Sequence, residues 1–151
     1  MDVERFVPED FTPPTSLVTD RFRLEPLGPQ HNESDLAAWT SSIEHVRATP
    51  GFAGSWPPPE GMSLEANGDD LTKHAADFEA RTGFTFTVLD PATDEVVGCV
   101  YIYPSKSADH DVQVKSWVRA DVAELDTPLA DAVAGWMRAD WPWQRPDRHG
   151  R

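Results

Sequence analysis

Groups that could carry acid–base chemistry lie together in one stretch of the sequence. Asp109, His110 and Asp111 enclose an imidazole between two carboxylates, which could orient the ring as a general base. A solvated connection between two strands is the alternative explanation of these three residues. Tyr101 and Tyr103 fall on one face of a predicted strand, where they either reach a cleft or pack in the core or at its rim. We take His110, Asp111 and Tyr103 as the candidate catalytic residues.

A second set of candidates is aromatic and lies in a segment that cannot be regular. Residues 49–62, TPGFAGSWPPPEGM, contain four prolines and three glycines. Two large aromatic side chains of this segment, Phe52 and Trp56, need a burial partner in so long a connection. They either line a substrate-binding site together with Tyr101 or simply cover the sheet.

The remaining reactive residue types form no pattern. Cys99 falls within a predicted buried strand, where we expect a small core side chain and not a nucleophile. Four further histidines are scattered without the spacing of metal ligands, so we predict no metal site. These four are His31, His45, His74 and His149.

The composition restricts the class of partner and the compartment. Of 151 residues, 26 are acidic and 13 are Lys or Arg, so the formal charge is −13. So acidic a chain repels a phosphate backbone and an anionic membrane surface, and we expect neither nucleic acid nor membrane as a partner. A single cysteine excludes an internal disulfide and indicates a reducing compartment. Residues 1–10 lack the features of a signal peptide, so we expect a cytoplasmic protein.

Three amphipathic helices are predicted from apolar residues three and four positions apart. The first starts near 32–34 and ends at Pro50, the second runs from a Ser63 cap to Gly83, and the third covers 127–139. The apolar stripe of the first helix consists of Leu36, Trp39, Ile43 and Val46.

Four strands are predicted, over 19–27, 84–89, 96–103 and 112–118. The run VVGCVYIY at 96–103 is nearly all apolar, so we expect a central strand that is buried on both faces. The last three strands follow one another through short links, which favours an antiparallel meander. The element order, β-α-α-β-β-β-α with a short terminal strand or tail, defines an α+β domain.

The length fits one domain with short extensions at both ends. We assign 1–18 to an irregular N-terminal arm, 19–145 to the domain and 146–151 to a C-terminal tail. Phe6 and Phe11 are expected to dock the arm onto the domain.

Three stretches stand in a familiar order: RFRLEPL in the first strand, GFTFTVLDPATDEVVGCVYIYP in the central hairpin, and VKSWVRADVAELDTPLADAVAGWM where a strand leads into a helix. In this order they resemble the GNAT superfamily of acetyl-CoA-dependent N-acetyltransferases, over about residues 21–143. The resemblance implies a GNAT-like, mainly antiparallel central sheet flanked by helices. It also implies transfer of an acetyl group from acetyl-CoA to an amine.

The resemblance further implies where the cofactor and the acceptor would lie. The pantetheine arm of acetyl-CoA would pair with strand 112–118, and the pyrophosphate would lie on loop 119–126, where a helix N-terminus binds anions. The segment 52–62 would close over the acceptor. The implied cofactor-binding residues are Trp117, Val118, Arg119, Glu124, Leu125, Asp126 and Thr127.

The sequence departs from the family's pattern in that loop. The family has Q/R-x-x-G-x-G/A, whereas 119–126 reads RADVAELD, without glycine and with carboxylates at Asp121, Glu124 and Asp126. Two unit charges about 4 Å apart in partly screened surroundings interact by roughly 4 kcal/mol, so a carboxylate beside the phosphates weakens binding. A carboxylate can instead cap its own helix. Two functions therefore stay open: an acyltransferase, or a GNAT-fold module that binds a ligand without using acetyl-CoA.

A second departure concerns the general acid. GNAT proteins often present a Tyr from a further helix, and this sequence ends a few residues after Trp143. Catalysis would then rely on the central strands or on a partner chain that completes the sheet, such as a second copy in a homodimer. The acidic surface favours a cationic acceptor, which we expect to be a small or peptidic amine.

Overall fold

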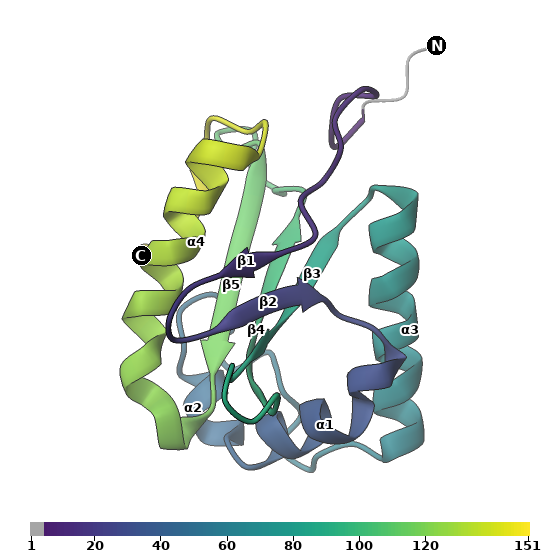
Figure 1. Ribbon diagram of the computed structural model, residues 1–151, viewed down its shortest axis with the longest axis vertical. Helices are drawn as coiled ribbons and strands as arrows, with labels where there is room; N and C mark the ends of the chain where they lie inside the picture. The colour runs from purple at the N-terminus through teal and green to yellow at the C-terminus, as the bar shows by residue number, and fades with distance from the viewer. Residues whose placement is uncertain (1–4) are drawn as a thin grey trace.

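The structure, a computed structural model that describes residues 5–151, is built around one six-stranded sheet (Figure 1). The strands lie in sequence order across the sheet. Their bounds are β1 Leu17–Val18, β2 Arg23–Pro26, β3 Phe84–Leu89, β4 Val96–Tyr103, β5 Val112–Val118 and β6 Pro146–Asp147. The helices are α1 Asn32–Thr40, α2 Ile43–Arg47, α3 Leu64–Ala80 and α4 Asp126–Asp140, with 3-10 turns η1 Pro29–His31 and η2 Ala120–Leu125.

The three central strands confirm the predicted ranges 84–89, 96–103 and 112–118, and they form the predicted antiparallel meander. The sheet is mainly antiparallel, with β5 and β6 as its parallel pair. Most of β4 is buried on both faces, as its apolar run predicted. The register of β4 and β5 sets Tyr101 opposite Lys115, which therefore share one face of the sheet.

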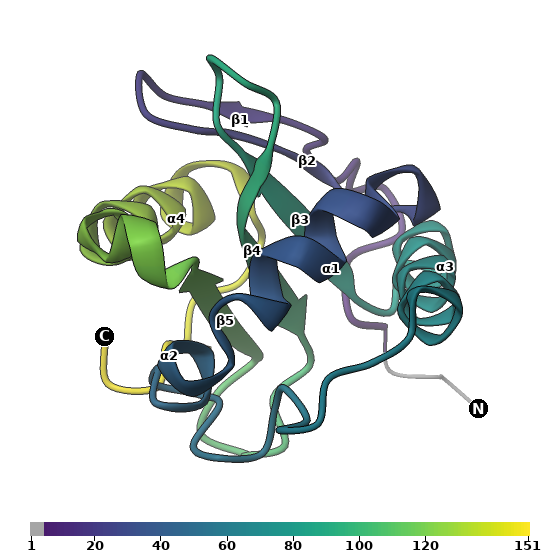
Figure 2. The same cartoon turned by 90° about the horizontal axis from the view of Figure 1, so that it is seen from below.

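Helices cover both faces, with α4 on one side of the sheet and α1 and α3 on the other (Figure 2). Two apolar cores result. Leu129 and Val133 of α4 share the first core with Val100 of β4. Trp39 of α1 shares the second with Trp117 of β5. The two faces of the sheet therefore have separate apolar cores, and the candidate site lies on the side of the second core.

The prediction of one helix up to Pro50 is wrong in one respect, because the structure has two helices in this range. α1 ends at Thr40 and α2 starts at Ile43. The hydroxyls of Thr40 and Ser41 donate to carbonyls of the preceding turn. The Ser42 hydroxyl accepts the backbone N–H of Ala120 at 2.8 Å. The local bonds of Thr40 and Ser41 compete with continuation of the helix. The bond of Ser42 connects the break between α1 and α2 to the loop after β5.

The other two predicted helices are present with altered ends. The Ser63 hydroxyl caps α3 as predicted by accepting the N–H of Ala66 at 3.0 Å. α3 ends before the predicted stop, because Arg81 already adopts a left-handed conformation with φ of 64°. α4 starts at Asp126 without any side-chain cap, so the expectation that a carboxylate of the loop caps this helix is wrong.

Both ends of the described chain pack on the domain. Phe6 stacks on Trp143 with ring centroids 4.6 Å apart, and Phe11 lies 5.7 Å from Trp141, which confirms that the two rings dock the arm. The assigned arm and tail also contribute the short strands β1 and β6, so neither is wholly irregular. Residues 1–4 of the arm lie outside the described part. Within residues 5–151, no helix is long and apolar enough to cross a membrane.

Candidate functional site

A pocket with a volume of about 600 Å³ opens above the second core, between α3, the segment after α2 and the ends of β4 and β5. Its lining combines aromatic rings with groups of both charges. The lining residues are Phe52, Ser55, Trp56, Asp70, His74, Tyr101, Tyr103, Pro104, Ser105, Lys106, Gln113 and Lys115.

The three predicted substrate-binding residues all line this pocket. The Trp56 ring lies 6.0 Å from Phe52 and 6.3 Å from Tyr101, centroid to centroid. Trp56 also contacts the rings of Trp39 and Trp117 beneath it. The aromatic side chains of segment 49–62 therefore cover the sheet and line a pocket at the same time, and their role in substrate binding stays a prediction.

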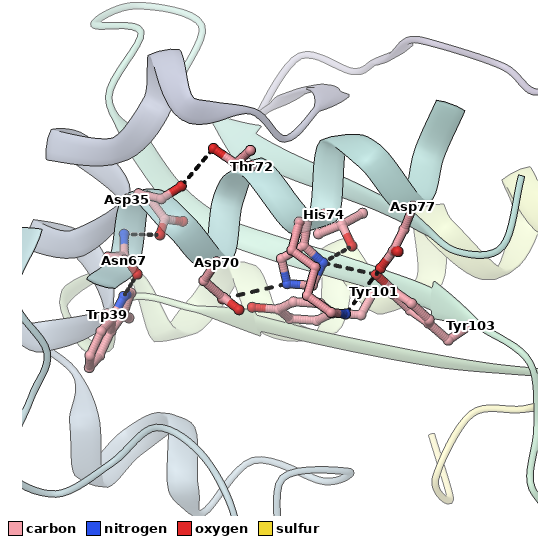
Figure 3. A network of polar contacts seen from close by, with 12 residues as sticks. Asp35, Trp39, Asn67, Asp70, Thr72, His74, Asp77, Tyr101 and Tyr103 are labelled. Atoms are coloured by element: carbon pink, nitrogen blue, oxygen red, sulfur yellow. Dashed lines mark hydrogen bonds and ion pairs between the residues drawn. The ribbon is translucent and has the colours of Figure 1, made fainter. Parts of the chain in front are cut away.

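His74 lies on α3 at the centre of a polar cluster (Figure 3). Its Nδ1 is 2.9 Å from the Tyr103 hydroxyl and 2.9 Å from the Thr85 hydroxyl. Its Nε2 lies 3.6 Å from Asp70, one helical turn earlier on α3. The hydrogen bond to His74 holds the pKa of Asp70 below its ordinary value. The arrangement is an imidazole held between hydroxyls and a carboxylate.

The contacts of Tyr103 and Asp70 each favour a proton on a different nitrogen of His74. The Tyr103 hydroxyl donates to Asp77 at 2.8 Å, so its oxygen is left to accept from His74 Nδ1. Nε2 faces the Asp70 carboxylate at 3.6 Å, and this contact is a hydrogen bond only when Nε2 carries a proton. Burial raises the pKa of Tyr103, so the phenol stays protonated at neutral pH. The candidate Tyr103 thus lies beside a base, although its catalytic role is untested.

Beside this cluster, a buried carboxyl group holds α1 against α3 (Figure 3). Asp35 is 4% exposed and accepts a hydrogen bond from Asn67 of α3 at 3.1 Å. Asn67 in turn accepts from Trp39 Nε1 at 3.1 Å. Burial raises the pKa of Asp35 to about 6. These contacts fix the helix that carries Asp70 and His74.

The structure does not bring His110 and Asp111 to this pocket. They line a different hollow together with Trp143, on the far side of the connection after β4. The two Asp111 oxygens each accept a backbone N–H, from Gln144 and Arg145, both at 3.0 Å. These bonds position the chain where it enters β6. Their catalytic role stays a prediction, and the geometry favours the alternative of a structural connection.

The implied cofactor loop is occupied by its own ion pairs. Arg119 binds the Asp121 carboxylate through two nitrogens, both at 2.9 Å, and its third nitrogen reaches the Val96 carbonyl at 3.3 Å. This pairing raises the pKa of Arg119 and lowers that of Asp121. Arg119 therefore has little capacity left for a phosphate. Glu124 and Thr127 are exposed, and Leu125 is the N-cap residue of α4.

Trp117 and Val118 end β5 on opposite faces. Trp117 donates its Nε1 hydrogen to the Tyr101 hydroxyl at 3.1 Å, whereas Val118 belongs to the core under α4. β6 pairs with β5 at Val112 and Gln113, and within the described chain no strand continues beside the rest of β5. That free edge is the position at which the resemblance places the pantetheine arm.

The space beside this edge is filled by the chain itself. The Arg151 guanidinium pairs with Asp126 at the start of α4 and donates to the Ser116 carbonyl of β5 at 3.4 Å. The cavity left between β5, α4, Arg148 and Arg151 has a volume of only about 20 Å³. A pantetheine arm has no room at this strand edge while Arg151 lies there, and the acidic, glycine-free loop does not fit a pyrophosphate.

Comparison with known proteins supports the fold. No known family profile matches the sequence, and no curated protein matches it. Solved structures do match. The ribosomal-protein-S5-alanine acetyltransferase from Vibrio fischeri has a TM-score of 0.61 at 14% identity, over 82% of this chain and 67% of that one. A GNAT-family acetyltransferase from Bacillus anthracis has a TM-score of 0.55 at 13% identity, over 82% and 66%.

A third match is a ligand complex. The microcin C7 self-immunity acetyltransferase, solved with acetyl-CoA and AMP, has a TM-score of 0.61 at 12% identity, over 85% of this chain and 67% of that one. At these identities the likeness shows the fold. The chain therefore has the α+β fold of the GNAT acetyltransferases, as its sequence resemblance implied.

The sequence interpretation missed Asp70 and His74 and treated His74 as one scattered histidine. A signal was present, because the two residues are four positions apart on a predicted amphipathic helix and therefore share a face. Within residues 5–151, no three His, Cys, Asp or Glu side chains are grouped so as to hold a metal ion.

Proposed function

We propose that the protein transfers an acyl group from a CoA thioester to an amine bound in the pocket that His74 lines. The observation that carries this proposal is the Asp70–His74 pair, which faces a pocket on the β4–β5 surface of an acetyltransferase fold.

The chemistry requires an amine that has lost its proton, because an ammonium group has no lone pair for attack. His74 Nε2 accepts that proton, and the adjacent Asp70 stabilises the imidazolium that forms. Thr85 and Tyr103 hold the ring by its other nitrogen throughout. Bound acetyl-CoA would supply the activated acyl thioester, and the CoA thiolate that leaves would take up the proton that His74 has accepted.

A second function is favoured by a different observation. The pairing of Arg119 with Asp121 and of Arg151 with Asp126 leaves the implied cofactor site filled and acidic. A GNAT-fold module that binds a ligand in the pocket without acyl transfer would have this property.

Titration with acetyl-CoA separates the two functions. The acyltransferase predicts binding heat and a thermal shift at millimolar acetyl-CoA, followed by release of free CoA when an acceptable amine is added. Absence of both signals at millimolar acetyl-CoA would contradict the acyltransferase and leave the binding module. His74→Gln should bind acetyl-CoA as the wild type does, because His74 belongs to the acceptor pocket.

A further inference from the structure

The pocket has two polar walls of opposite charge. Asp70 and His74 form one wall on α3, and Lys115 forms the other on β5. The walls are close, since the His74 and Tyr101 rings are 5.7 Å apart and Lys115 lies directly opposite Tyr101 in the register. Opposed residues of antiparallel strands have Cβ atoms about 5 Å apart. One small ligand can therefore reach both walls.

In the part of the chain that the structure describes, the positive charge of Lys115 is not paired with a carboxylate. It is half-buried, and within residues 5–151 no carboxylate lies within 4.0 Å of its ammonium group. The nearby Lys106 on the rim has none either. The Lys115 ammonium lies 5.8 Å from the centroid of the Phe52 ring. In a chain with twice as many acidic as basic residues, a half-buried lysine without a carboxylate partner favours a ligand with a negative group.

The space between the walls is aromatic. Phe52, Trp56 and Tyr101 face it with mutual centroid distances of 6.0 to 6.3 Å. Tilted and edge-on geometries of this kind suit packing against one further ring. A volume of about 600 Å³ is in the range of small-molecule sites.

We propose that the acceptor is a free aromatic α-amino acid. Its ammonium group lies against Asp70 and His74, its carboxylate against Lys115 and its ring against Trp56 and Tyr101. The proposal rests on the proposed function for the fate of the amine, but the binding geometry can be tested without acyl transfer.

Four probes separate the three contacts. L-phenylalanine carries all three groups, 2-phenylethylamine lacks the carboxylate, 3-phenylpropionate lacks the amine, and L-phenylalaninamide replaces the carboxylate by a neutral amide and so imitates a peptide N-terminus. Binding is measured by calorimetry and by quenching of tryptophan fluorescence, with and without CoA. We expect L-phenylalanine to bind about tenfold more tightly than each of the other three, since a charge-assisted contact is lost in each.

Paired variants assign each group to its wall. Lys115→Gln should weaken L-phenylalanine about tenfold and leave 2-phenylethylamine unchanged. Asp70→Asn should weaken all three probes that carry an amine and leave 3-phenylpropionate unchanged. Asp69→Asn, the neighbouring and exposed aspartate on α3, and Arg138→Gln on the exposed side of α4 are the matched controls and should change no affinity.

Several outcomes would overturn the proposal. Equal binding of L-phenylalaninamide and L-phenylalanine would indicate a peptide N-terminus as the acceptor, and absence of binding by L-phenylalanine with and without CoA would exclude this class of ligand. Failure of the proposed function looks different: L-phenylalanine would bind as expected while acetyl-CoA gives no binding heat and no acyl transfer.

Discussion

At the scale of single residues, the proposed chemistry depends most on His74. Its Nδ1 is held by two hydroxyls, so only Nε2 is available to a substrate. Glutamine keeps a polar group but cannot take up a proton. We expect His74→Gln to lower kcat about a hundredfold, the usual scale of general-base catalysis, while KM for the amine changes little. Steady-state kinetics with the acceptor found by titration measure both.

The neighbouring carboxylates provide the comparison. Asp70→Asn should lower kcat less than His74→Gln, because it removes only the stabilisation of the imidazolium. Asp69→Asn should leave kcat unchanged. If His74→Gln retains the wild-type kcat and the wild-type thermal stability, His74 is not the base.

Asp35 predicts an unusual dependence of stability on pH. Its pKa in the folded protein is about 6, against an ordinary value of 3.8, because it is buried. The folded state therefore holds this proton more tightly than the unfolded state. The resulting stabilisation is complete below the ordinary value and is lost as the pH rises through about 6, and it amounts to about 3 kcal/mol.

Asp35→Asn isolates this contribution, because the amide cannot titrate. Urea unfolding at a series of pH values should show the wild type losing stability relative to Asp35→Asn as the pH rises from acidic to neutral. A constant difference between the two proteins over that range would show that the Asp35 carboxyl does not titrate with the raised pKa.

The site could be predicted only in part, and the reason is geometric. Phe52 and Trp56 were found because large aromatic side chains in an irregular segment need burial, and Tyr101 because its face of the predicted strand could reach a cleft. His110 and Asp111 were attractive because they are adjacent in sequence, yet their backbone contacts draw Asp111 towards Gln144. Adjacency in sequence does not predict where a loop side chain points.

At the scale of elements, the loop from Arg119 to Asp126 decides whether acetyl-CoA is used. Glu124→Gly with Asp126→Gly removes two carboxylates, frees the backbone and leaves Arg151 without its partner at the start of α4. We expect this double variant to bind acetyl-CoA on the order of tenfold more tightly than the wild type in low salt. Calorimetric titration measures the change.

Two further variants separate the causes. Glu124→Gln with Asp126→Asn removes the same charges without glycine, so a smaller gain there would assign the remainder to backbone freedom. Arg151→Ala opens the edge of β5 but removes a cation. Tight wild-type binding that the glycine variant weakens would show that the acidic loop itself holds the cofactor.

Gly98 tests the packing of the central strands. A Cβ at this position would collide with the backbone carbonyl oxygen of Trp117 on β5, which cannot move without disturbing the sheet. We expect Gly98→Ala to destabilise the fold by about 1–3 kcal/mol, measured as the free energy of unfolding in urea. Gly135→Ala in α4 has only a flexible arginine nearby and should stabilise by about 0.5–1 kcal/mol. Equal effects of the two substitutions would contradict the close approach of β4 to β5.

The elements were predicted best where one physical signal dominates. β3, β4 and β5 match their predicted bounds, because their apolar and β-branched runs are bounded by turn residues. The break between α1 and α2 was missed, because Ser42 is engaged by Ala120 from a distant part of the chain. The spacing of apolar residues within a helix does not indicate a contact with a distant part of the chain.

At the scale of the whole molecule, the net charge of −13 opposes an anionic cofactor wherever it binds. Acetyl-CoA is itself a polyanion, and the loop that would hold its pyrophosphate adds Glu124 to the repulsion, because Arg119 and Asp121 neutralise each other. Salt screens such repulsion over about 10 Å at ordinary ionic strength. We therefore expect the affinity for acetyl-CoA to rise with added salt, the reverse of the usual behaviour of a phosphate site.

The zwitterionic probe L-phenylalanine supplies the internal control for this effect. It carries no net charge, so its affinity should change little over the same range of salt concentration, as measured by the same titration. An acetyl-CoA affinity that falls with salt would show that cations, in the first place Arg119 and Arg151, hold the phosphates after exchanging their present partners. The loop would then be a cofactor site that opens by breaking its own ion pairs, and the net charge of the molecule would have little influence on the reaction.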